Sequence, residues 1–202
     1  MKRELFIAEI EKNEELISMI KSEASNLHDI VCNQKYDSFP YSKHLCMVAE
    51  VAIEYGHTVC INEKDVIPII FAAYFHDSIE DARVTYNDVM KIAKKYMDAE
   101  QAKIATEIVY ALTDEKGRTR DERGSDKHYK DIQDTLYAPF VKWCDRYANT
   151  KYSIENKSRM ANVYRREMIR FIIKLGGNKY IGDELCKLII NLGNDIEIGT
   201  NI

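Results

Sequence analysis

The feature that most constrains this chain is the helical spacing of its apolar residues. Near the amino terminus they recur every three or four positions, which places them along one stripe of one or two amphipathic helices over residues 3–31. The stripe consists of Leu5, Ile7, Ile10, Leu16, Ile17, Ile20, Ala24, Leu27 and Val31. The whole chain has only 8 Gly and 3 Pro, too few for the many tight turns of an all-β sandwich. The sequence therefore predicts an all-α fold.

Local start and stop signals divide the chain into further helices. Pro40 suits the first turn of a helix that stops at Gly56, and Asn62 is a candidate N-cap for a fully apolar helix. Thr85 and Asp98 fit the starts of two more helices. The helices expected after residue 31 cover 41–55, 66–75, 85–96, 98–112, 136–154, 158–175 (ending at 176–177) and 179–192 (ending at Gly193). A loop is expected over 33–39, and a charged loop that runs into a polar helix over 113–130. No repeat or flexible linker interrupts this pattern, so we expect one domain over residues 1–202, in which 150–202 complete a helical bundle.

Composition and charge narrow the classes of function. A net charge of −4 argues against a broad nucleic-acid surface, although a local basic cluster could still hold a small phosphorylated ligand. The 5 cysteines form no CxxC pair, which argues against a disulfide scaffold or a thiolate zinc site. The amino terminus does not resemble a signal peptide, and no apolar run is long enough to span a membrane. We expect a cytoplasmic protein that binds neither nucleic acid nor membrane; its oligomeric state is not predicted.

A dense group of polar residues follows the most apolar segment of the chain. The run VIPIIFAAYF (66–75) leads directly into His76 and Asp77, and Glu80 and Asp81 follow four positions later. If the helix continues, spacing of four residues brings His76 near Glu80 and Asp77 near Asp81. If these groups are buried, the three acids repel one another and all four side chains are poorly solvated, and a bound divalent cation relieves both effects. The alternative is that the helix reaches the surface here and the acids face water.

Two polar residues interrupt other apolar stripes and could join this group. His44 breaks the stripe of the helix over 41–55, and Asp145 lies beside Trp143 and Cys144 in an amphipathic stretch. Each also has a simpler explanation. His44 could be a core histidine that makes one hydrogen bond, and Asp145 could form a salt bridge with Arg146. Two His and two Asp from three helices would form a mixed nitrogen and oxygen site, which suits Mn²⁺ or Fe²⁺ better than structural zinc.

The order of these motifs resembles the signature of the HD-domain metal-dependent phosphohydrolases. The matching segments are PYSKH (40–44), HDSIED (76–81) and KWCDRYAN (142–149), within a match that spans residues 34–149. The branch that looks most similar is that of the guanosine tetraphosphate (ppGpp) hydrolases: the hydrolase halves of the RelA/SpoT enzymes and small free-standing hydrolases similar to them. The resemblance implies an all-helical HD-domain bundle that prefers manganese, with Fe²⁺, Mg²⁺ and Zn²⁺ as alternative ions.

The resemblance also assigns roles to individual residues. It implies His44, His76, Asp77 and Asp145 as metal ligands and Glu80 and Asp81 as the acid/base pair beside the attacking water. The residues it suggests for binding a nucleotide substrate are Lys35, Tyr41, Lys116, Arg118, Arg120, Arg123, Arg146 and Asn149. For the basic residues of 116–123 a solvated, salt-bridged surface is the alternative.

The chain departs from the family pattern at a few positions. Ala82 and Arg83 follow the Glu-Asp pair where a threonine is usual, and Lys35 stands where arginine is commoner. We expect these changes to affect which nucleotide binds more than the type of reaction. His28, His57 and His128 match no motif and are expected to be structural or surface residues.

The sequence thus predicts hydrolysis that removes the 3′-pyrophosphate from (p)ppGpp by a metal-activated water. One alternative is an HD-domain nucleotidase or phosphatase that acts on another nucleotide. A second is a module that senses a nucleotide without turning it over.

Overall fold

The computed structural model describes residues 1–114, 118–175 and 178–198. The first helices are α1 (Arg3–Lys12), α2 (Glu14–Ser25), the π-helix η1 (Asn26–Val31), α3 (Ser42–Tyr55), α4 (Val66–Phe75), α5 (Ser78–Asp81), α6 (Tyr86–Ala93) and α7 (Ala99–Leu112). The later helices are α8 (Arg120–Arg123), α9 (Asp126–Asp134), α10 (Ala138–Glu155), α11 (Met160–Leu175) and α12 (Asn178–Ile198). Short 3₁₀ turns occur at η2 (Gly56–Thr58) and η3 (Glu63–Asp65). The predicted all-α fold is confirmed.

The strand content of the described residues is a single small hairpin. Strand β1 (Lys35–Tyr36) pairs antiparallel with β2 (Phe39–Pro40), so that Lys35 faces Pro40 and Tyr36 faces Phe39. Pro40 therefore lies in the hairpin, and α3 begins at Ser42. The prediction that Pro40 occupies the first turn of this helix is wrong, because the proline ring ends a strand, where its missing N–H is also tolerated.

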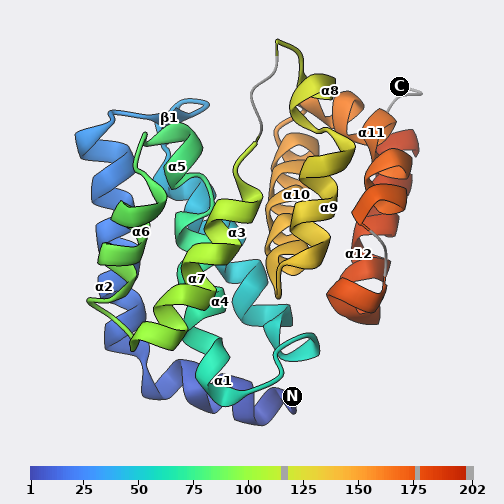
Figure 1. The fold of residues 1–202 in the computed structure, drawn as a ribbon. Helices are drawn as coiled ribbons and strands as arrows, with labels where there is room; N and C mark the ends of the chain where they lie inside the picture. Colours follow the sequence, from blue (N-terminus) through green and yellow to red (C-terminus); the bar gives the residue numbers. More distant parts are fainter. Residues whose placement is uncertain (115–117, 176–177, 199–202) are drawn as a thin grey trace.

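Helix α4 forms the centre of the molecule, and the other helices are layered around it. Every residue of α4 is buried. It packs against α3, α7 and α2. Helix α10 packs against α3 and also contacts α4 and α7, and α11 and α12 pack on α10 (Figure 1). A helix that is apolar on all faces is stable only when neighbours cover it completely, so the carboxyl end of α4 is held rigidly. The site described below is built at that end.

Capping interactions determine where α6 and α7 begin. Thr85 and Asp88 form a reciprocal capping box at the start of α6, and Asp98 and Gln101 form another at the start of α7. The predicted apolar stripe of α7 is buried: Ala102, Ala105, Ile108, Val109 and Leu112.

Two other predicted helix boundaries are moved in the structure. Asn62 donates a side-chain hydrogen bond to Asp65, and Asp65 itself is the N-cap residue of α4. Over 3–31 the chain forms two helices, one of the two predicted alternatives, and the second continues into the π-helix. Helix α12 continues to Ile198 instead of ending at Gly193, and its break lies at Gly182, whose φ of 70° favours glycine. The expected stop at residues 176–177 lies outside the described residues.

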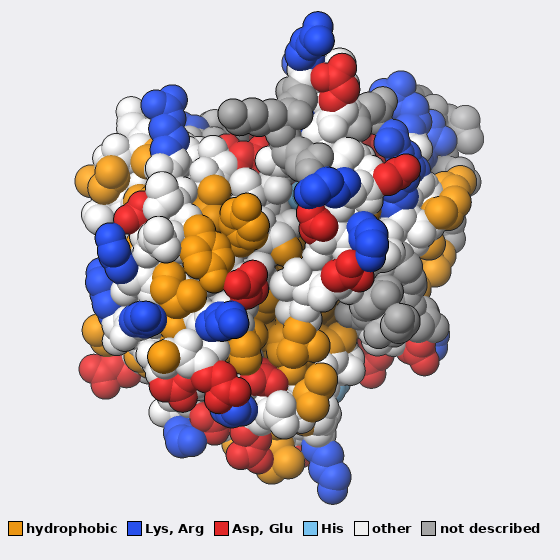
Figure 2. All heavy atoms as spheres, viewed as in Figure 1, with side chains coloured by type: hydrophobic (Ala, Val, Ile, Leu, Met, Phe, Trp, Pro, Cys, Tyr) orange, Lys and Arg blue, Asp and Glu red, His pale blue; other side chains and the backbone are white. Residues whose placement is uncertain are grey.

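The face of the molecule seen in Figure 2 is mixed in character. Hydrophobic side chains gather over α6 and α7, and Lys, Arg, Asp and Glu side chains surround them. Among the exposed residues of this region is Tyr110 of α7, whose ring meets that of Tyr86 edge-on at 5.5 Å between centroids. Of the helices that the structure describes, none combines the length and apolar character needed to cross a bilayer.

Candidate functional site

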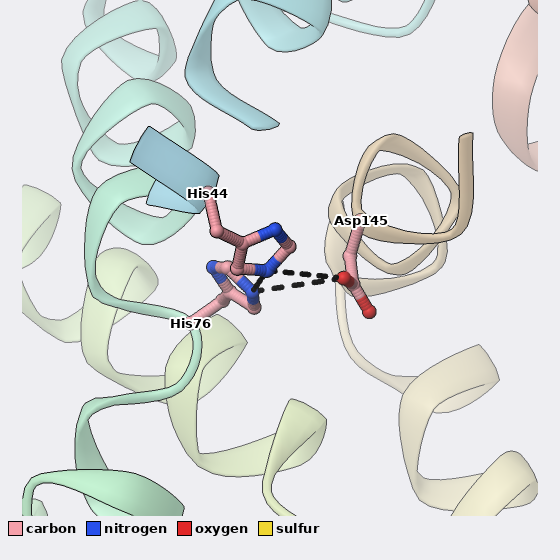
Figure 3. Close-up of side chains that lie close together, drawn as sticks. All are labelled: His44, His76 and Asp145. Atoms are coloured by element: carbon pink, nitrogen blue, oxygen red, sulfur yellow. Dashed lines mark hydrogen bonds and ion pairs between the residues drawn. The ribbon is translucent and has the colours of Figure 1, made fainter. Parts of the chain in front are cut away.

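Three side chains from separate helices converge at the carboxyl end of α4. His44 comes from α3, His76 directly follows α4, and Asp145 comes from α10 (Figure 3). The Nε2 atoms of the two histidines are 3.2 Å apart. The Oδ1 atom of Asp145 lies 3.4 Å from Nε2 of His44 and 3.8 Å from Nε2 of His76. One ligand atom from each residue lies within 4.8 Å of the other two, so this cluster could hold a metal ion.

Asp77 reaches the same atoms from the turn between α4 and α5. Its Oδ2 atom is 2.9 Å from Nε2 of His76 and 3.5 Å from Nε2 of His44. Helix α4 ends at Phe75, where the Ser78 hydroxyl donates a 2.7 Å hydrogen bond to the Phe75 carbonyl. This local bond competes with the helical ladder and turns the chain, so Asp77 meets the histidines although the helix does not continue through it.

The chemistry of these donors fits a divalent cation. Nδ1 of His76 is 2.9 Å from the Ala73 carbonyl and must donate to it, which leaves Nε2 as the ring atom with a lone pair. Both histidines are buried, at 2% exposure, and two Nε2 atoms 3.2 Å apart require positive charge between them or a proton on one ring. A cation between the imidazoles and the carboxylates satisfies all of these groups at once.

Without a cation, a proton on His44 balances the carboxylates. Burial alone would lower the pKa of His44, but hydrogen bonds and charges of Asp145 and Asp77 raise it to about 9. Burial would raise the pKa of Asp145, yet the His44 bond and the Lys142 charge hold it well below its usual range. The pKa of Asp77 is likewise lowered by His76 and His44 against the effect of burial. Both carboxylates are thus kept ionised.

These groups form one wall of a polar cleft, which also contains Glu80 and Asp81 of α5. The cleft is lined by Tyr36, Tyr41, His44, Asp77, Glu80, Asp81, Asp114, Gly124, His128, Tyr129, Lys142, Asp145, Arg146, Asn149, Tyr164, Glu167, Arg170 and Phe171. Burial raises the pKa of Glu80, as do Asp114 and Asp77. Burial also raises the pKa of Asp81, with a further contribution from Asp77. Two neighbouring carboxyls with raised pKa values, the half-buried Asp81 and the more exposed Glu80, are suited to exchanging protons.

Tyr41 joins the metal-binding cluster to Asp81. Its hydroxyl is 2.6 Å from Oδ2 of Asp77 and 3.0 Å from Oδ2 of Asp81. Burial and both carboxylates raise the pKa of Tyr41, so the phenol keeps its proton. Tyr41 lines the cleft, as expected, but its hydroxyl is engaged by carboxylates.

Glu80 is held from the opposite side by the start of the charged loop. Its Oε2 atom accepts a 3.3 Å hydrogen bond from the Asp114 backbone N–H. The Asp114 side chain in turn lies 3.5 Å from Nε2 of His128 and 4.0 Å from Nε of Arg123. His128, expected to be structural or at the surface, is buried and lines the cleft. Arg123 pairs with Asp114 and does not line the cleft.

Helix α10 contributes further residues to the cleft besides Asp145. Asn149 donates its side-chain amide to Oδ1 of Asp145 and accepts a 2.8 Å hydrogen bond from the Tyr36 hydroxyl. Arg146 pairs with Glu167 at 2.8 Å and lies over the Phe171 ring, so the alternative pairing with Asp145 is not formed. Lys142 instead lies 3.6 Å from Oδ2 of Asp145.

The remaining predicted substrate residues are outside the cleft or outside the described residues. Lys35 is exposed in β1 and does not line the cleft, and the exposed Arg118 does not line it either. Lys116 lies outside the described residues, and the same holds for the side chain of Arg120. An exposed position in a two-residue strand explains why Lys35 points to solvent: the neighbouring Tyr36 takes the inward side.

Sequence reasoning missed several residues of the cleft, including Tyr36, Asp114, Lys142 and Arg170. Lys142 was detectable, because it lies three positions before Asp145 in the same helical run and thus on the same face. Arg170 and the other residues of α11 carried no comparable signal, because the packing of α11 against α10 decides their position.

Comparison with known proteins identifies the fold. No protein-family model matches the chain, and no curated protein matches it. A solved structure of a metazoan ortholog of SpoT, described as hydrolyzing ppGpp and playing a role in starvation responses, superposes with a TM-score of 0.65 at 16% identity. The match covers 89% of this chain and 94% of that one. The chain therefore shares the all-α fold of that protein, and the resemblance predicted from the motifs is confirmed at the level of the fold.

Proposed function

We propose that the protein is a metal-dependent phosphohydrolase that releases pyrophosphate from the 3′ position of (p)ppGpp. The observation that carries the proposal is the convergence of His44, His76, Asp77 and Asp145 beside Glu80 and Asp81 in one cleft. The shared fold with a protein described as hydrolyzing ppGpp supports this substrate over other nucleotides.

The four residues of the cluster would hold the cation, and Mn²⁺ is the ion we expect. When bound, a divalent cation lowers the pKa of a coordinated water and neutralises charge on phosphoryl oxygens. The Ala73 carbonyl holds the His76 ring, the Asn149 amide holds Asp145 and the Tyr41 hydroxyl holds Asp77, so these three groups keep their geometry without substrate.

Glu80 and Asp81 would take the proton of the attacking water. Oε2 of Glu80 is occupied by the Asp114 amide, which leaves Oε1 to accept a proton. Asp81 shares its Oδ2 with the Tyr41 hydroxyl, so its Oδ1 is the corresponding atom. Either carboxyl could act as the base, since burial raises the pKa of both toward the working range.

Basic and amide groups of α10 would position the substrate. Lys142 lies among the carboxylates of the cleft, and its ammonium would balance phosphoryl charge as it develops. Asn149 and Arg146 also line the cleft, and we retain them as contacts for the nucleotide. Because Lys35, Arg118 and Arg123 do not line the cleft, they are not included in this proposal.

The test is product analysis with purified protein, Mn²⁺ and guanosine 3′,5′-bisdiphosphate. We expect stoichiometric pyrophosphate, loss of release after chelation, and loss in Asp145→Asn. A matched control is Asp131→Asn, since Asp131 lies in an exposed pair with Lys127 away from the cleft. Release of orthophosphate alone would favour a phosphatase acting on another ester. Nucleotide binding without any product would favour a sensing module.

A further inference from the structure

His28 is a buried side chain outside the metal-binding cluster, and it is fixed at both its backbone and its ring. It lies in η1 and is 0% exposed. Its carbonyl accepts a 2.9 Å hydrogen bond from the Gln34 backbone N–H, and its Nδ1 is 2.6 Å from Oε1 of Gln34. An amide oxygen only accepts, so Nδ1 carries the proton in this contact. Both ends of the residue are thereby held in one orientation.

The face of the His28 ring supports Tyr41. The two rings are stacked, with centroids 5.1 Å apart and planes inclined by 10°. Nε2 of His28 is buried and has no hydrogen-bond partner among the described residues, so the Gln34 bond is the hydrogen bond that orients the ring. A phenol ring held on its face cannot tilt, and the direction of its hydroxyl is fixed with it.

That hydroxyl is the connection between Asp77 and Asp81. It lies 2.6 Å from one carboxylate and 3.0 Å from the other, so a small tilt of the ring would lose one of the two contacts. The π-helix that carries His28 has a Cys32 N–H to Leu27 carbonyl bond, which spans five residues. Such a widened turn re-aims one side chain relative to a regular helix and is frequent at functional sites.

We propose that His28 is a positioning residue for the hydrolysis: its stacked ring orients Tyr41, and Tyr41 in turn holds Asp77 and Asp81 in register. This inference rests on the proposed function for its kinetic consequence. It assigns a role to a histidine that matches none of the motifs in the sequence and that lies outside the residues lining the cleft.

The kinetic test is a double-mutant cycle between His28 and Tyr41. We expect His28→Ala to lower kcat for pyrophosphate release by about 10- to 100-fold, as for other residues that orient metal ligands, with little change in KM. In the Tyr41→Phe protein the same substitution should cost less than about threefold, because the hydroxyl it orients is already gone. An equal loss in both backgrounds would show that His28 acts through general packing and would overturn the proposal.

Two further variants separate orientation from loss of fold. His28→Phe keeps a ring face against Tyr41 and gives up the Gln34 bond, so we expect it to retain kcat within about threefold. A loss as large as that of His28→Ala would contradict the role of the stacked ring. His57→Ala is the matched control, because His57 lies at η2, away from the cleft, and should leave kcat unchanged. All rates are compared at a temperature where thermal melting shows each variant to be folded.

A measurement that needs no substrate keeps this inference separate from the proposed function. In protein labelled at tyrosine, the Tyr41 hydroxyl proton is assigned by its disappearance in Tyr41→Phe. We expect it to exchange with solvent several-fold faster in His28→Ala and unchanged in His57→Ala. Unchanged exchange in His28→Ala would overturn the inference even in an active enzyme. Faster exchange in a protein that releases no pyrophosphate would support the orientation of Tyr41 while refuting the proposed function.

Discussion

Glu80 and Asp81 are neighbours in the chain, but different parts of the molecule hold them. Glu80 accepts a hydrogen bond from the backbone of Asp114, whereas Asp81 meets the hydroxyl of Tyr41. A substitution at Glu80 therefore changes the acid/base pair without touching the contacts between Tyr41 and the metal-binding cluster. This separation makes the proton-transfer step testable by itself.

We predict that Glu80→Gln lowers kcat by about 10²- to 10⁴-fold, the usual contribution of a positioned general acid or base. Glutamine keeps an acceptor oxygen for the Asp114 amide but takes no proton at neutral pH. Steady-state pyrophosphate release measures the effect, and Mn²⁺ should still raise the melting temperature of the variant as in the wild type. A variant with unchanged kcat would remove Glu80 from the reaction and leave Asp81 as the base.

At single positions, the sequence was informative where a residue lies on a helix with a clear apolar stripe. His44 and Asp145 interrupt such stripes, and the structure brings both to the cluster. The sequence was uninformative where a charged residue lies in a charged segment. Arg123 pairs with Asp114 instead of entering the cleft, and nothing in a run of alternating charges distinguishes these two outcomes.

At the level of elements, two of the three predicted caps were correct, whereas Asn62 does not cap α4. Thr85 and Asp98 cap α6 and α7 as their sequence context predicts. The chain after α4 instead turns at His76 and Asp77, because the Ser78 hydroxyl binds the Phe75 carbonyl. A serine just after an apolar helix gives no indication from sequence whether its hydroxyl will bond to its own helix or to another partner.

The cap of α7 provides a prediction about stability. Asp98 accepts hydrogen bonds of 2.9 Å from the backbone N–H groups of both Glu100 and Gln101. We expect Asp98→Ala to lower the free energy of unfolding by about 1 kcal/mol and the melting temperature by about 2–4 °C. Because Asp98 caps the amino-terminal end of α7, whereas the cleft residue Asp114 follows its carboxyl-terminal end, kcat per folded molecule should not change.

Calorimetry with a matched surface variant checks this prediction. Asp131→Ala removes an exposed carboxylate of the pair with Lys127, and such pairs contribute little. A melting temperature that falls equally in both variants would mean that the Asp98 cap adds nothing beyond surface charge. A kcat that falls with Asp98→Ala would show that α7 is coupled to the cleft.

At the scale of the whole molecule, helix packing brings together residues that are far apart in the chain. His44 and Asp145 are separated by about a hundred positions, and they meet because α10 packs on α3 while α3 packs on α4. Periodicity predicts each helix and its buried face, but it does not predict which helices are neighbours. The family resemblance, through the order of the motifs, indicated which helices meet at the site. It did not indicate the position of α11, whose residues also line the cleft.

The last prediction follows from this convergence of three helices. A cation held by residues of α3, α10 and the end of α4 binds only the folded chain, because the unfolded chain does not bring these residues together. At a concentration 100 times its dissociation constant, Mn²⁺ should stabilise the fold by about 2.7 kcal/mol and raise the melting temperature by about 5–10 °C. Chelation should reverse the shift. Asp145→Ala should abolish it, whereas His57→Ala should preserve it, since His57 is remote from the cluster. If Mn²⁺ shifts the melting of Asp145→Ala as much as that of the wild type, the ion binds elsewhere, and the cluster is a buried polar network without a metal.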